Sequence, residues 1–265
     1  HAHSNRLAKL LLRIAKNANE PNKEHIICLE RAERKLRVKD KGISKKMWDR
    51  LRILLDEENA AKILLLAEDV IAKIDRKSPK MTDAWMVQSA LIVSLLLRAP
   101  MKEAILASLD IDKHIIKISK NLYLIKISEE ETANGLPLEY ELTGNALKIL
   151  KLYLKVYRPL LAQTPTTKLL ISRAGRQKPG YELAAQIPKF IEKHTGLKMN
   201  IGLFRHFVAV LYIHKNKNDT ETLRRILSHV FSETIYTFYQ SFIKQHSFDA
   251  LDRLIQDGYA EFKNA

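Results

Sequence analysis

The sequence contains a single cysteine, Cys28, and this scarcity excludes several classes of protein. One thiol forms neither an intramolecular disulfide nor a zinc site built from several cysteines, so nothing indicates an oxidising compartment. Long apolar runs are also missing, because the longest stretch, residues 86–97, is well short of the roughly 20 residues of a membrane span. We therefore expect a cytoplasmic protein with no membrane segment.

Glycine is scarce as well, with 8 residues in the chain, and no Gly-rich phosphate loop occurs. This absence argues against a nucleotide-binding enzyme. No internal repeat or low-complexity segment occurs either. The hydrophobic content of 46% is ample for a packed core, so a globular chain with one or two domains is expected.

The most distinctive property of the composition is its positive charge. Lys and Arg number 45 against 30 Asp and Glu, which gives a formal net charge of +15 and a pI near 9.7. Residues 1–55 contain 15 Lys and Arg against 6 Asp and Glu, a net charge of +9. Such a balance is typical of proteins that bind a polyanion, although a merely soluble basic protein has it too.

The spacing of apolar residues predicts a mainly helical chain. Spacings of three and four residues indicate short basic helices between residues 5 and 56, a helix over 59–74 and an apolar helix ending near Leu97. The period then changes to two, which predicts three strands of a small antiparallel sheet. These strands cover 114–119, 122–128 and 138–142. Helical spacing returns over 145–161 and 184–196, continues through 202–239, and ends with an amphipathic segment over 247–262.

A group of polar residues near the C-terminus has a recognisable spacing. The segment GLFRH contains Arg205 and His206, ILSH ends at His229, and SETIYTFY ends at Tyr239, ten residues after that histidine. This pattern resembles the catalytic domain of the tyrosine recombinases, the phage-integrase family. The resemblance extends upstream, where APMKEAILASL is similar to the family's Ala-Pro-Met-Arg segment and EETANGLPLEYEL to its Lys-bearing β-hairpin. In all it covers roughly residues 58–245.

The resemblance implies a fold and a reaction. The fold is mainly α with a small three-stranded antiparallel sheet: a tyrosine-recombinase-like catalytic domain over 58–265, preceded by a basic, helical, core-binding-like domain, whole or partial, over 1–57. The implied catalytic residues are Tyr239, Arg205, His229 and Lys102. Tyr239 would form a 3′-phosphotyrosyl link with duplex DNA while the cationic groups stabilise the phosphate. The bond energy is conserved, so no cofactor and no metal are expected.

Three of the six expected catalytic positions depart from the family pattern. Lys102 stands where the family has its first Arg, Ala133 replaces the hairpin Lys, and Gly202 replaces the first His of His-x-x-Arg. Lys102 keeps the charge but loses the planar fork of a guanidinium, while Ala133 supplies no proton and Gly202 no donor. A smaller change, Ser228 for Gly, concerns the end of a helix. Catalysis is therefore expected to be much weakened.

Other residues near these positions allow further interpretations. Tyr236 and Tyr239 would each be ordinary amphipathic side chains if considered alone, and His206 and His214 suit packing or surface roles. Arg98 is a possible stand-in for the lost Arg, and Lys126 or Lys120 for the lost Lys. Three functions stay open: a recombinase, a degenerate integrase that binds DNA without cutting it, and a helical regulator unrelated to integrases.

The last segment carries an apolar stripe at helical spacing, and in the family such a C-terminal helix commonly docks on a neighbouring protomer. We therefore expect self-association on DNA through this segment, or docking within the same chain. The stripe consists of Phe248, Leu251, Leu254, Ile255, Tyr259 and Phe262.

Overall fold

A computed structural model describes residues 2–18, 22–36, 45–132, 135–216 and 219–227. Its contacts divide the chain into two compact units, residues 1–44 and 45–265. The first unit is a pair of packed helices, α1 (Ala2–Lys16) and α2 (Lys23–Leu36), joined by an ion pair of 2.7 Å between Lys16 and Glu30. Asn22 begins α2 by accepting hydrogen bonds from the backbone N–H groups of residues 24 and 25.

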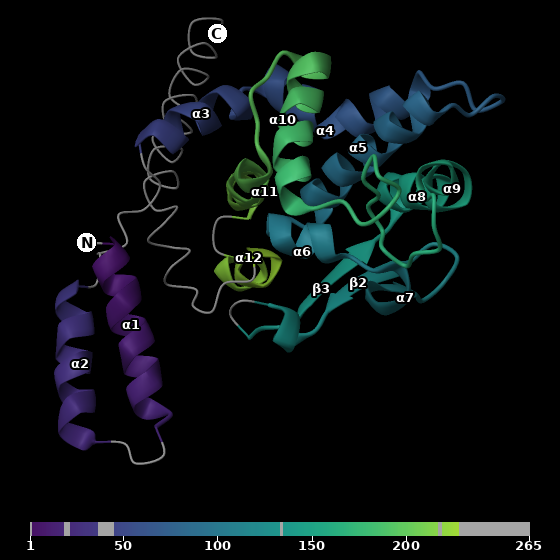
Figure 1. The fold of residues 1–265 in the computed structure, drawn as a ribbon. Coiled ribbons are helices and arrows are strands. Elements are labelled where there is room, and N and C mark those ends of the chain that lie inside the picture. Colours follow the sequence, from purple (N-terminus) through teal and green to yellow (C-terminus); the bar gives the residue numbers. More distant parts are fainter. Residues whose placement is uncertain (1, 19–21, 37–44, 133–134, 217–218, 228–265) are drawn as a thin grey trace, which may run out of the picture. The chain divides into compact units, whose positions relative to one another are not determined.

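The second unit is larger and contains all remaining elements (Figure 1). Its helices and strands follow one another in this order: α3 (Lys45–Leu55), α4 (Glu57–Ala72), α5 (Met81–Arg98), α6 (Glu103–Ser108), α7 (Ile111–His114), β1 (Ile115–Lys117), β2 (Tyr123–Ile127), the short 3₁₀ turn η1 (Glu129–Glu131), β3 (Leu138–Leu142), α8 (Gly144–Leu152), the π-helical turn η2 (Tyr153–Tyr157), α9 (Arg158–Leu161), α10 (Gly180–Thr195), α11 (Ile201–Lys215) and α12 (Thr220–Leu227).

The boundary between the units differs from the expected domain limit at residue 57. Leu51 and Leu54 of α3 are almost completely buried, and α3 packs against α4 and α11 of the second unit. Burial of these leucines places α3 with the larger unit, because apolar side chains are stabilised where a neighbouring element covers them. The basic segment 1–57 is thus divided between two structural units.

Helix α5 is the centre of the second unit. It is apolar around most of its circumference and buries nearly all residues from Val87 to Leu96, as expected of a helix enclosed by others. Helices α4, α8, α10 and α11 pack around it (Figure 1). The amide of Gln88 bonds both backbone groups of Ile171, at 2.7 and 3.0 Å, and so fixes the loop before α10 to this core.

The sheet confirms the predicted one: three antiparallel strands in the order β1-β2-β3. Ile115 pairs with Ile125, and Ile127 pairs with Leu138 next to the β2–β3 connection. Burial alternates along β3, with Tyr140 facing the core and its two glutamate neighbours facing solvent. His114, expected at the start of the first strand, ends α7 instead. In the described part of the chain, no helix is long and apolar enough to span a bilayer.

Candidate active site

Arg205 lies where three elements of the second unit meet. It lies in α11. Asn200 caps the start of this helix, because its side chain accepts a hydrogen bond of 3.0 Å from the backbone N–H of Leu203. Phe204 and Phe207, on either side of Arg205 in the sequence, are fully buried. Their packing fixes the position of α11 and so the direction in which the half-buried Arg205 points. Its Nη2 donates a hydrogen bond to the carbonyl oxygen of Leu227, the last residue of α12.

The third element near Arg205 is strand β3. Burial raises the pKa of Tyr140 on this strand to about 12, and the positive charge of Arg205 opposes that rise. The guanidinium therefore lies close enough to the Tyr140 hydroxyl to influence its ionisation. Arg205 thus influences β3, the second strand of the hairpin, and is bonded to Leu227 of α12, which immediately precedes Ser228 and His229 in the sequence.

Lys102 occupies the position directly before α6. Its side chain is exposed, whereas Pro100 and Met101 before it are buried, so the backbone of the segment is anchored while the ammonium reaches solvent. Helix α10 packs against both α6 and α11, which makes it the common neighbour of the elements that carry Lys102 and Arg205. The elements that carry these two predicted residues thus pack on one common helix.

Gly202 lies on the surface, one turn before Arg205 in α11. A Cβ atom added there would meet only the Oδ1 atom of Asn200 within 4 Å, at 3.6 Å, an ordinary van der Waals distance. Residues three apart share one face of a helix, so a side chain at 202 would stand beside Arg205. Packing therefore does not require glycine at this position.

The other predicted site residues lie outside the described residues. Tyr239 and His229, expected as nucleophile and donor, are among them, as are Ala133 and Ser228. Tyr236, the side chain of His214 and the apolar stripe of residues 248–262 are outside them too. Their roles stay predictions. His206, by contrast, is half-buried in α11 next to Arg205.

The two lysines considered as stand-ins for position 133 lie elsewhere on the sheet. Lys120 precedes β2, whereas the β2–β3 connection with position 133 follows β2, so the length of a five-residue strand separates them. Lys126 is exposed and pairs across the strands with Glu139. Arg98, the possible stand-in for the lost Arg, is exposed at the last residue of α5.

A hydrogen-bonded network holds the chain just before position 133, and sequence reasoning missed it. The buried ring of His114 accepts a hydrogen bond at Nδ1 from the backbone N–H of Asp110, so Nε2 carries the proton and donates to Glu131 at 3.0 Å. Glu131 also accepts from Ser128 at 3.0 Å and pairs with Lys113 at 2.8 Å. The hydrogen bond from Lys113, more than those from Ser128 and His114, lowers the pKa of Glu131 to about 2.

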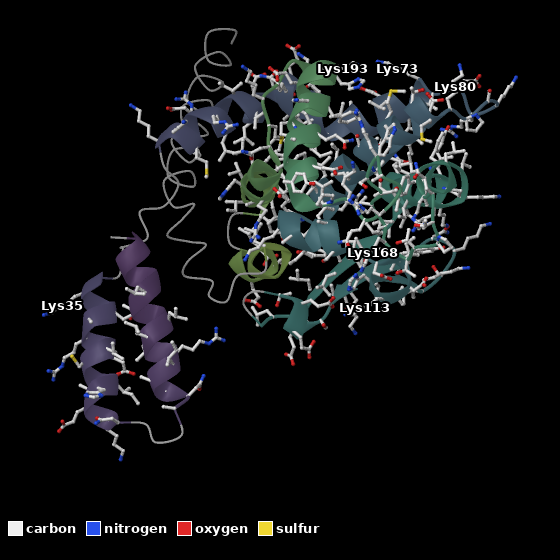
Figure 2. All side chains as sticks on the ribbon, in the orientation of Figure 1. Lys35, Lys73, Lys80, Lys113, Lys168 and Lys193 are labelled. Atoms are coloured by element: carbon white, nitrogen blue, oxygen red, sulfur yellow. The ribbon has the colours of Figure 1, made fainter. Side chains whose placement is uncertain are left out.

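The same helix, α7, is tied to the loop that leads to α10. Asp110 caps α7, accepts a hydrogen bond of 2.5 Å from Thr167 and pairs with Lys168 at 3.2 Å (Lys113 and Lys168 are labelled in Figure 2). Burial alone would raise the pKa of Asp110, but the hydrogen bonds from Thr167 and Lys168 hold it at about 2. Two ionised carboxylates are therefore used here: Glu131 fastens the β2–β3 connection to α7, and Asp110 fastens α7 to the loop before α10. Among the described residues, no group of three or more His, Cys, Asp and Glu is arranged to hold a metal ion.

Comparison with known proteins gives matches of structure. No family model matches the sequence, and no curated protein matches it either. A crystal structure of XerH site-specific recombinase bound to palindromic difH substrate, a post-cleavage complex, is similar with a TM-score of 0.57 and 20% identity, covering 80% of this chain and 56% of that one. The pre-cleavage complex of XerH with difH gives 0.53 and 20%, covering 69% and 49%. XerA recombinase gives 0.48 and 15%, covering 91% and 83%.

The chain thus has the fold of the tyrosine recombinases, as the sequence resemblance implied. At 20% identity these matches show the fold alone. The chain spans about half of the XerH chains that it matches.

Proposed function

We propose that this protein binds duplex DNA and acts on it as a site-specific recombinase or integrase. The observation that carries the proposal is the placement of Arg205 on the recombinase fold, bonded to the end of α12 two residues before His229. That arrangement provides one guanidinium at the junction of hairpin, α11 and α12. A cytoplasmic location, in keeping with the single Cys28, is part of the proposal.

In the proposed reaction, the hydroxyl oxygen of Tyr239 attacks a DNA phosphorus atom. The bond between phosphorus and the 5′ oxygen breaks, the 5′ oxygen takes up a proton, and a 3′-phosphotyrosyl link remains. Arg205 and His229 would stabilise the negative charge that grows on the non-bridging oxygens, with Lys102 adding a single ammonium. The reverse step rejoins the DNA, and the reaction requires no reactant other than the protein and the DNA.

A second candidate function, DNA binding without efficient cleavage, is favoured by the surroundings of the hairpin. Position 133 offers no proton for the leaving oxygen, and η1 just before it carries three glutamates, two of them exposed. Exposed carboxylates beside a DNA phosphate are unfavourable, because like charges repel. Under this second candidate function, the protein retains the fold and the basic surface that bind DNA, but the rate of DNA cleavage is very low.

Covalent trapping separates the two candidates. A nicked suicide substrate with the cognate site should yield an adduct that resists denaturant, at low yield with the natural chain. Tyr239→Phe should abolish the adduct, whereas the matched control Tyr236→Phe should retain it. A substrate whose leaving group needs no proton should be cleaved much faster, because the lack of an acid at Ala133 then no longer slows the reaction. Salt-sensitive binding with no adduct on either substrate would support the second candidate.

A further inference from the structure

A cavity of about 560 Å³ lies between α5 and α10, lined by none of the candidate active-site residues. Trp85 and Met86 from α5 and Phe190 from α10 form its apolar part. The loop before α10 closes it with Arg173 and Lys178. A concave site of this size, partly apolar and with a few polar groups, is typical of those that bind a small molecule.

Lys178 is the most unusual residue of this cavity. Only 2% of it is exposed, and its Nζ atom lies 5.0 Å from the centroid of the Trp85 ring. Nζ donates a hydrogen bond of 2.8 Å to Oε1 of Gln186, whose amide nitrogen in turn donates to Oγ of Ser89 at 2.8 Å. The ammonium is therefore held in one place by a chain of hydrogen bonds.

Within the described residues, the charge of Lys178 is compensated only in part, by the ion pair with Glu182. An ammonium has three donors, and Gln186 takes one of them. The carboxylate of Glu182 is 3.6 Å away, too long for a good hydrogen bond, and about a third of that side chain faces solvent. Burial lowers the pKa of Lys178 by more than the carboxylate of Glu182 raises it. An acceptor from outside the chain would complete the coordination of this buried cation.

The rim of the cavity is also positive. Arg173, Lys189 and Lys193 are exposed there, while Glu182 is the one carboxylate among the described lining residues. Burial lowers the pKa of His194, and the charges of Lys193 and Lys73, both labelled in Figure 2, lower it further. An anion is therefore attracted to the entrance as well as to the interior.

We propose that this cavity binds a small organic anion that carries a phosphate or carboxylate group on an apolar ring. The anionic group accepts hydrogen bonds from Lys178, and the ring packs against Trp85 and Phe190. The inference goes beyond the proposed function and requires no reaction at Tyr239. A protein of this fold would then carry a ligand site separate from its DNA chemistry.

Tryptophan fluorescence tests the proposal directly, because the chain has two tryptophans, Trp48 and Trp85. In a Trp48→Phe variant, Trp85 is the sole tryptophan and reports from the cavity wall. Titration with phenyl phosphate should give a saturable change in its emission, whereas phenol at the same concentrations should not. A change of equal size with phenol, or no saturation with phenyl phosphate, would overturn the proposal.

Three variants in the Trp48→Phe background assign the binding to the cavity. Lys178→Met, which keeps an unbranched side chain without the ammonium, should weaken binding of phenyl phosphate at least about tenfold, because a hydrogen bond to a charged group is lost. Arg173→Met, on the exposed rim, should weaken the binding of phenyl phosphate by a smaller factor. This variant tests the proposal even if Lys178→Met fails to fold. The control Lys155→Met, exposed on η2, should leave binding unchanged. Equal binding by all three variants would refute the assignment.

Duplex DNA distinguishes a free ligand from a DNA phosphate, since the same ammonium suits both. Phenyl phosphate should bind with unchanged affinity when the chain is saturated with duplex DNA. Displacement by DNA that depends on Lys178 would mean that the cavity receives the DNA backbone, and the small-molecule assignment would be wrong. Failure of covalent trapping at Tyr239 leaves this experiment unaffected, so the two proposals fail separately.

Discussion

At the scale of single residues, the candidate site contains one guanidinium whose hydrogen bonding is defined, that of Arg205. Positions 102, 133 and 202 lack the Arg, Lys and His that are expected there. Arg205 is bonded to the end of α12 and lies near Tyr140 of β3. Gly202, one turn earlier, leaves room for a side chain, and Lys102 is exposed. The structure around positions 102 and 202 therefore leaves room for the missing groups.

Gly202→His should raise the rate of adduct formation by about ten- to a hundredfold, because it adds a donor beside Arg205 where a Cβ meets nothing closer than 3.6 Å. The control Gly202→Ala should stabilise α11 by up to about 1 kcal/mol and leave the rate unchanged. Combination with Lys102→Arg and Ala133→Lys should raise activity further. Single-turnover cleavage of the suicide substrate measures both effects. If the triple variant forms no adduct on an authentic site, the assignment of these positions is mistaken.

At the scale of elements, the connection between β2 and β3 depends on the ionised carboxylate of Glu131. The pKa of Glu131 is about 2 in the folded chain, against an ordinary value of 4.5. A carboxylate with a lowered folded pKa contributes its stability above pH 4.5 and loses it as the pH falls toward 2. The hairpin is therefore expected to loosen in acid before the helical core does.

Glu131→Gln should lower the free energy of unfolding by about 1 kcal/mol at pH 7, because it removes the charge that Lys113 and His114 face. The difference from the natural chain should shrink between pH 4.5 and 2, as Glu131 itself becomes protonated. Urea unfolding at several pH values measures it. The exposed neighbour Glu129→Gln serves as the control and should change little. A constant difference across this pH range would show that the network is not electrostatic.

At the scale of the whole molecule, the positive charge is spread over two structural units. The helical pair of residues 1–44 and the larger unit both carry exposed Lys and Arg side chains. Binding through both units would release many counterions from DNA, which makes affinity depend steeply on salt. The salt dependence therefore reports how much of the chain contacts DNA.

The triple variant Arg13→Gln, Arg31→Gln and Lys35→Gln removes three exposed charges from the first unit and should reduce the slope of log K against log salt by about two to three. A matched change at Lys148 and Lys155, on α8 and η2, should leave the slope close to that of the natural chain. Fluorescence anisotropy with a labelled duplex at several salt concentrations measures both. An unchanged slope in the triple variant would exclude the first unit from the contact.

Removal of residues 247–265 should reduce the assembly of the protein on DNA, because the apolar stripe from Phe248 to Phe262 is lost. Sedimentation of the intact and shortened chains with duplex DNA measures the change. Identical assembly states would remove this role from the segment.

The sequence alone determined the order and type of the main elements. The change of apolar period from about 3.6 to two predicted the three antiparallel strands, and the return to helical spacing predicted α8, α10 and α11. These features are local, because the period of a segment depends on residues a few positions apart. The spacing of Arg205, His229 and Tyr239 likewise pointed to the recombinase fold, which the structural matches confirm, although the catalytic roles of these residues stay predictions.

Only the tertiary structure decided which of these elements belong together and which polar groups are buried. Leu51 and Leu54 are buried against the larger unit, so α3 lies outside the helical pair. His114 meets Glu131, and the loop that carries Lys178 is bonded to Gln88 of α5, 83 residues before Ile171. Contacts between distant positions leave no periodic trace in the sequence. A lysine in the loop before α10 therefore looked like any surface charge, although folding buries it beside Trp85.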